Sequence, residues 1–284
     1  EIVDYHTNII LIQRDEEVLF HAEPTEGGKP EQTDRSVLNV EEIVRFADCL
    51  DVADVEEILS RQVAYNSAIS AEGLKGGWGA EVGKTLRGLY GVDVAVRAKA
   101  AAAAGSDARM SGCEMPVVIV SGSGNQGMTT SLPVIEYARD MGASDEELYR
   151  ALAVADLVTI HQKTGIGRLS AYCGAVSAGV GAGCGIAWLR GADYDGVGHT
   201  ICNAVAMISG CICDGAKASC ASKIAMAIGT GILGYNMYLG GNNFRPGDGI
   251  EGDDVEETIR NVGILASKGM HETDRVILNI MTGQ

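Results

Sequence analysis

Three cysteines have the residue type and spacing of a metal site. Cys213 and Cys220 are separated by Asp-Gly-Ala-Lys-Ala-Ser, and Cys173 precedes them in the chain. In one continuous helix the step from Cys213 to Cys220 would rise about 10.5 Å, too far for two thiolates on one small cluster. Asp214-Gly215 is a pair typical of a helix end. We therefore predict that Cys213 closes one helix and that Cys220 lies in the first turn of the next, where a thiolate is favoured.

The number of thiols distinguishes between metals. Structural zinc usually takes four ligands, with a tight Cys-x2-Cys pair or closely spaced histidines, and this sequence offers neither pattern. An iron–sulfur cluster takes thiolates, and one that lacks a fourth protein ligand keeps an open iron that can act as a Lewis acid. The alternative is that the cysteines are small buried residues of Gly/Ala-rich helices. The remaining cysteines are interpreted as packing residues: Cys49, Cys113, Cys184, Cys202 and Cys211.

A glycine-rich segment is the second candidate site. It follows an apolar run, 115–120, and precedes a helix, so its backbone N–H groups are placed to bind an anion. It lacks the lysine of a Walker loop and the acidic residue of a dinucleotide site, which favours a small carboxylate over ATP or NAD. The alternative is a turn without a ligand. The predicted substrate-binding residues are Ser121, Gly122, Ser123, Gly124, Asn125, Gln126 and Gly127.

Lys163 is the candidate catalytic residue, because it precedes Cys173 by ten residues and an ammonium group can pair with a substrate carboxylate. The alternative is a solvated lysine near a helix end.

Composition narrows the class of partner. The net charge is −16, which argues against nucleic acid. Residues 157–247 nevertheless carry six basic and three acidic side chains together with six of the eight cysteines, which suits an anionic ligand or a thiolate-bound metal. The uncharged run 169–189 is long enough to span a bilayer but consists mostly of Gly, Ala, Ser and Cys, so we predict a buried helix and no membrane partner. Reduced, clustered thiols without a signal peptide predict a cytoplasmic protein.

The elements that must position these residues are mostly helical. Residues 1–24 predict a short β-hairpin, the remnant of a truncated α+β domain, and 25–35 a linker. Residues 36–284 predict a compact, mainly α cluster-binding domain of small-residue-rich helices, compatible with a homodimer. The later helices are predicted over 129–141, 145–162, 168–189, 199–213, 218–238, 253–268 and 270–282.

Several motifs occur here in one order: Ser106-Asp-Ala-Arg-Met110, Gly122-Ser-Gly-Asn-Gln-Gly127, Leu169-Ser-Ala-Tyr-Cys-Gly174, Cys213-Asp-Gly-Ala-Lys217 up to Cys220, and Gly269-Met-His-Glu-Thr-Asp274. Together they resemble the L-cysteine desulfidase family, related to the iron–sulfur L-serine dehydratase α-chain, over most of residues 60–284.

The resemblance implies a [4Fe–4S] cluster held by Cys173, Cys213 and Cys220, with one open iron. It implies β-elimination from a small amino acid: L-cysteine gives pyruvate, ammonia and sulfide, and L-serine is the alternative substrate. A non-catalytic metal-binding module is a further alternative. The family also has an N-terminal Cys-Thr-Glu-Pro motif, thought to supply a catalytic cysteine, that nothing here matches. The chain resembles the C-terminal two thirds of such a protein, and we expect it to be weakly active or inactive alone, even if it binds a cluster.

Overall fold

The computed structural model describes residues 1–2, 8–23, 33–167 and 170–283. The chain divides into two units, residues 1–37 and 38–284. Within the described ranges there are eleven α-helices and one two-stranded sheet, so the prediction of a mainly α protein is confirmed.

The first unit contains the predicted hairpin. Strand β1 (Leu11–Arg14) pairs antiparallel with β2 (Glu17–His21), and Arg14 lies opposite Glu17. The turn is therefore the two residues Asp15 and Glu16, with Asp15 in the left-handed region at φ 53°. The predicted linker, 25–35, falls mainly outside the described residues.

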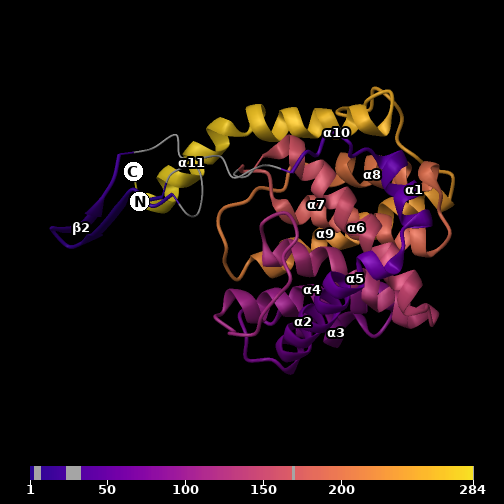
Figure 1. The fold of residues 1–284 in the computed structure, drawn as a ribbon, viewed down its shortest axis with the longest axis horizontal. Helices are drawn as coiled ribbons and strands as arrows, with labels where there is room; N and C mark the ends of the chain where they lie inside the picture. The colour runs from indigo at the N-terminus through magenta and orange to yellow at the C-terminus, as the bar shows by residue number, and fades with distance from the viewer. Residues whose placement is uncertain (3–7, 24–32, 168–169, 284) are drawn as a thin grey trace. The chain divides into compact units, whose positions relative to one another are not determined.

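The second unit is helical (Figure 1). Short polar side chains cap several of its helices, and α6 begins with a capping box in which Ser144 and Glu147 bind each other's backbone N–H groups. The helices are α1 (Val40–Cys49), α2 (Glu56–Lys75), α3 (Val82–Tyr90), α4 (Val94–Met110), α5 (Gly124–Met141), α6 (Asp145–Ile166), α7 (Gly174–Leu189), α8 (Tyr194–Ile208), α9 (Cys220–Leu239), α10 (Val255–Ile264) and α11 (His271–Thr282), with short helices η1 (Val52–Asp54) and η2 (Leu265–Gly269).

Helix boundaries differ most from the predictions around the cysteines. The helix predicted over 199–213 is α8, which the Asp193 side chain caps at its start and which ends at Ile208. The prediction that Cys213 closes a helix is therefore wrong, because the chain is already extended there. Helix α7 begins at Gly174, not at 168. Helix α5 begins at Gly124, not at 129, so the last four residues of the glycine-rich segment lie in its first turn.

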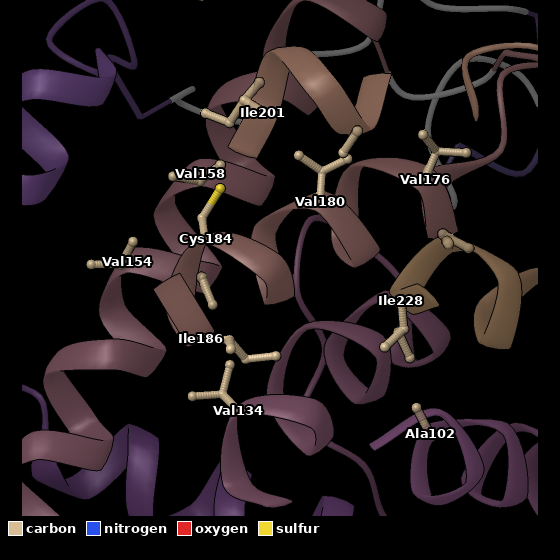
Figure 2. Close-up of a cluster of buried hydrophobic side chains, with 14 of the residues drawn as sticks. Ala102, Val134, Val154, Val158, Val176, Val180, Cys184, Ile186, Ile201 and Ile228 are labelled. Carbon is tan, nitrogen blue, oxygen red and sulfur yellow. The ribbon is translucent and has the colours of Figure 1, made fainter. Parts of the chain in front are cut away.

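Helix α7 is the centre of the second unit, and every residue from Ala175 to Ala187 is buried. It packs against α5, α6, α8 and α9, and Figure 1 shows it beside α6 and α9. Figure 2 shows its Val180, Cys184 and Ile186 among apolar side chains of neighbouring helices, including Val158, Ile201 and Ile228. The prediction of a helix buried all round is confirmed, and among the described residues no helix is long and apolar enough to cross a membrane.

The glycines of α7 allow this burial because they face its two main neighbours alternately. A Cβ on Gly183 would lie 2.6 Å from the carbonyl oxygen of Gly231 in α9. A Cβ on Gly181 would lie 2.5 Å from the carbonyl oxygen of Ala155 in α6. Because both distances are shorter than any normal contact of a side-chain carbon, only glycine permits these backbones to approach so closely. The packing of α7 in turn fixes its N-terminus, which Cys173 precedes.

Candidate metal and substrate site

Two extended segments bring three cysteines to one place. The Cys173 N–H donates to the Cys211 carbonyl over 3.1 Å, and the Cys213 N–H donates to the Ala171 carbonyl over 2.6 Å. Tyr172 and Ile212 form the antiparallel bridge between these bonds. Because alternate residues of an extended chain point to the same side, Cys173, Cys211 and Cys213 share one face of this short ladder and Tyr172 lies on the other.

The three thiols interact with one another. A hydrogen bond with the Cys173 thiol lowers the pKa of Cys211 to about 7. Burial opposes this shift, and the charge of Lys223 assists it. The hydrogen bond between Cys173 and Cys213, together with burial, raises the pKa of Cys213. Cys211 is therefore the preferred thiolate: Cys173 donates to it, and Cys213 donates to Cys173.

Cys211 is the member of this group that sequence reasoning missed, since it was interpreted as a packing residue. The signal that identifies it is the spacing Cys-Ile-Cys, which places both thiols on one side if the segment is extended. A helix predicted through residue 213 conceals that signal, because residues two apart on a helix do not face the same way.

Cys220 is the first residue of α9, as predicted. Gly215 has φ +95°, so the turn between Cys213 and Cys220 uses a backbone conformation that glycine adopts readily. The Cys220 Sγ lies 3.6 Å from the Gly215 carbonyl oxygen and accepts from the Lys217 N–H at 3.5 Å. The sulfur of Cys220 is thus engaged within its own turn.

Among the residues that the structure describes, no three cysteine, histidine or acidic side chains are arranged as a metal-binding group. The ligand set of Cys173, Cys213 and Cys220 therefore stays a prediction. What the structure does bring together is Cys173 with Cys213, in the company of Cys211.

Two lysines lie near the thiols and differ in environment. Lys163, near the end of α6, is only 9% exposed. Burial lowers the pKa of Lys163, and the nearby Cys213 and Cys173 oppose that shift. Lys223, in the first turn of α9, pairs with the Asp214 carboxylate. Hydrogen bonds from Lys217 and Lys223 together lower the pKa of Asp214 to about 2. Lys163 is therefore the more easily deprotonated of the two.

The glycine-rich segment divides into a tight turn, closed between Val120 and Ser123, and the first four residues of α5. Val120 and Ser123 exchange backbone hydrogen bonds of 3.3 and 3.2 Å, while Ser121 and Gly122 have φ values of 50° and 89°. Positive φ at both central residues is the pattern of a type I′ turn. The turn thus directs the chain into the first residues of α5.

The turn and the cysteines are neighbours. A Cβ on Gly174 would lie 2.6 Å from the Gln126 side-chain nitrogen, so Gln126 packs directly on the start of α7 beside Cys173. The Asn125 side chain accepts from Arg109 at 3.2 Å, which connects the first turn of α5 to the end of α4. Two predicted sites therefore meet at one helix end.

Buried polar atoms without a partner are found around this helix end. In the described part of the chain the oxygens Gln126 Oε1, Gln162 Oε1 and Ser177 Oγ are buried without a hydrogen bond. Gln162, in α6, donates to the Ser177 carbonyl at 3.4 Å, so its side chain lies against the first turn of α7. Unsatisfied buried groups are uncommon in folded proteins and often mark a site that an ion, water or ligand completes.

Asp107 is bound by the fold through only one of its carboxylate oxygens, since its Oδ1 is also buried without a hydrogen bond from the described residues. One of its carboxylate oxygens accepts from the Gly83 N–H at 3.0 Å in the first turn of α3. Burial raises the pKa of Asp107, while such backbone N–H groups oppose the shift. In the segment Ser106–Met110 it is Arg109 that extends toward the glycine-rich turn.

Comparison with known proteins identifies the family. Residues 22–279 match the serine dehydratase alpha chain family. A UPF0597 protein of Desulfitobacterium hafniense is 56% identical over 283 residues, which cover 100% of this chain and 66% of the relative. UPF0597 proteins of Lachnoclostridium phytofermentans and Treponema denticola are 51% and 46% identical, with 99% of this chain and 67% of each relative covered.

The chain thus spans about two thirds of the length of these curated relatives. No solved structure matches it. The matched residues include the helices α1 to α10, the glycine-rich turn and all eight cysteines. The chain therefore belongs to the serine dehydratase alpha chain family.

Proposed function

We propose that this chain is the cluster-binding and substrate-binding part of a lyase that eliminates the β-substituent of L-cysteine. The α-proton and the thiol leave, the resulting aminoacrylate tautomerises to an imine, and water releases pyruvate and ammonia, so that one cysteine and one water give pyruvate, ammonia and hydrogen sulfide. L-Serine, which would lose water in the same step, is the second candidate substrate because the family is described by its serine dehydratase chain.

One observation carries the proposal. Thiols, a buried lysine, unpartnered polar oxygens and a glycine-rich turn all meet at the N-terminus of α7. A helix N-terminus and an ammonium group favour a carboxylate, and carbonyl or hydroxyl oxygens favour an ammonium. An α-amino acid carries both groups on one carbon.

The cofactor that we propose is a [4Fe–4S] cluster on Cys173, Cys213 and Cys220. The donors fit in their chemistry, since thiolates are the usual ligands of such clusters and two of the three cysteines already interact. The cluster would supply a Lewis acid at the leaving group.

The remaining roles belong to the chain's own residues. Lys163 would pair with the substrate carboxylate, because an ammonium group with little exposure gains more from an anionic partner than a solvated one does. Residues 121–127 would orient that carboxylate through backbone N–H groups at the start of α5. Close packing of α7 would exclude bulk water from the reacting carbon.

The test is anaerobic reconstitution of the chain with iron and sulfide. We expect about four irons and four sulfides per chain, and a change in the visible spectrum when L-cysteine is added. Cys213→Ala is expected to abolish iron uptake, whereas Cys49→Ala, a change at an exposed cysteine of α1, is expected to leave it intact.

Pyruvate formation from L-cysteine and L-serine then separates the two substrates. A cluster whose spectrum responds to neither amino acid would support the metal-binding module and contradict the lyase. Iron uptake that is equal in Cys213→Ala and in the unchanged chain would contradict the ligand set.

A further inference from the structure

Lys223 joins α9 to the extended segment that carries two of the cysteines. Its Nζ donates to the Ile212 carbonyl oxygen over 2.9 Å and pairs with the Asp214 carboxylate. These two partners flank Cys213 on either side. One side chain from α9 therefore holds the residue before and the residue after a predicted ligand.

Lys217 offers a direct comparison within the same turn. It pairs with the same Asp214 carboxylate, and it donates to the Asp214 carbonyl oxygen at 2.8 Å. Both contacts are with a single residue three positions away, so they close the turn without attaching it to the 211–213 segment. Its side chain is 44% exposed, against 20% for Lys223.

The ammonium group of Lys223 keeps its charge. Burial disfavours that charge, but the pairing with Asp214 outweighs burial and raises the pKa of Lys223. Both contacts of Lys223 with the 212–214 segment are therefore made by a charged donor.

We infer that Lys223 is a positioning residue, which fixes Cys213 relative to Cys220 and so sets the separation of two ligands. Cys220 is the first residue of α9, and Lys223 lies three residues later in the same helix. The bond from Lys223 to Ile212 therefore attaches the 211–214 segment to the helix that carries Cys220. The part of this inference that concerns iron rests on the function proposed above, and the part that concerns the segment does not.

The experiment compares Lys223→Met, Lys223→Arg and Lys217→Met in the whole chain. In the cluster-free protein, hydrogen–deuterium exchange at the Cys173 and Cys213 amides reports the bonds between the two extended segments. We expect Lys223→Met to accelerate this exchange about tenfold or more, because a charge-assisted hydrogen bond is lost. Lys217→Met is expected to leave it unchanged, and Lys223→Arg to restore most of the protection.

Iron and sulfide content after anaerobic reconstitution is the second measurement. Lys223→Met is expected to retain less than about a third of the iron of the unchanged chain. Lys217→Met and Lys223→Arg are expected to bind about as much iron as the unchanged chain. Equal effects of Lys223→Met and Lys217→Met on exchange, or none from either, would overturn the inference. If Lys223→Met fails to fold by circular dichroism, Lys223→Gln replaces it and is expected to accelerate exchange in the same way. Exchange in Lys223→Gln equal to that of the unchanged chain would then overturn the inference.

The two proposals fail differently. If the unchanged chain takes up no iron while the exchange contrast between the lysines persists, the proposed function fails and the positioning of the segment by Lys223 stands. If iron is taken up equally by all three variants, the function stands and the claim that Lys223 sets the separation of the two ligands is refuted.

Discussion

Cys211 is the cysteine whose chemistry differs most from that of an ordinary buried thiol. With a pKa of about 7 it is partly ionised at neutral pH, whereas burial raises the pKa of Cys202 to about 12. Since the thiolate is the nucleophile, the two residues should react at very different rates. The group at the start of α7 is thus an activated sulfur centre even before any metal is considered.

We predict that Cys211 reacts faster than Cys202 with iodoacetamide in the cluster-free chain. The labelling rate of Cys211 is expected to be half-maximal near pH 7. The measurement is peptide mass spectrometry after timed labelling between about pH 6 and pH 9. Cys202, packed on Thr258, serves as the internal control. Labelling of Cys202 at the rate of Cys211 would contradict the assignment.

At the scale of the element, α7 depends on glycines that meet neighbouring backbones. Gly183→Ala would place a methyl group 2.6 Å from the Gly231 carbonyl oxygen, and neither backbone can move without disturbing the core. We predict a loss of about 1–3 kcal/mol in the free energy of unfolding, measured by urea denaturation.

The matched control is Gly88→Ala in α3, where an added Cβ meets nothing within 4 Å. There the better helix propensity of alanine should stabilise the protein by about 0.5–1 kcal/mol. Similar losses at both positions would show that close approach is not the reason for the glycines of α7.

Much of the helical architecture could be predicted from the sequence, because Gly, Asp and Ser mark many helix ends. Ser144 with Glu147 and Gly142 identify the boundary between α5 and α6. The end of α8 was predicted too late, because the apolar residues after Ser209 and Gly210 favour a longer helix although this pair marks a helix end. What ends that helix is the pairing of residues 211–213 with 171–173, a contact between segments forty residues apart.

The candidate site was predictable in its parts and less so in its assembly. Cys173, Lys163 and the glycine-rich turn could each be selected by residue type and spacing. Their meeting at one helix end depends on Gly174, which lets Gln126 pack on the start of α7. The unpartnered oxygens of Gln162 and Ser177 carry no local sequence signal, since their environment is created by packing.

At the scale of the whole molecule, a half-buried carboxyl group couples stability to pH. Asp156 in α6 accepts from the Gln62 side chain of α2 at 3.2 and 3.0 Å, and burial raises the pKa of Asp156 to about 7 while Gln62 opposes the shift. Because the folded-state pKa lies above that of the unfolded chain, the contribution of this group to stability is full below about pH 4 and is lost as the pH rises through about 7.

Asp156→Asn should remove that loss, since asparagine stays neutral and can still accept from Gln62. We predict that the variant is more stable than the unchanged chain by about 1–3 kcal/mol near pH 8 and that the advantage disappears near pH 4. Urea midpoints measured across this range provide the test. Two parallel curves would show that Asp156 does not titrate between these limits.

The alternation along Cys211-Ile212-Cys213 has a consequence for tolerance to change in chain length. Adding or deleting one residue between Ser209 and Cys211 would shift the pairing with Ala171–Cys173 by one step and turn each side chain to the opposite face. The sulfurs would then point toward the enclosed ring of Tyr172, and an isoleucine would take their place beside Cys173. Length, as much as residue identity, is what this connection must preserve.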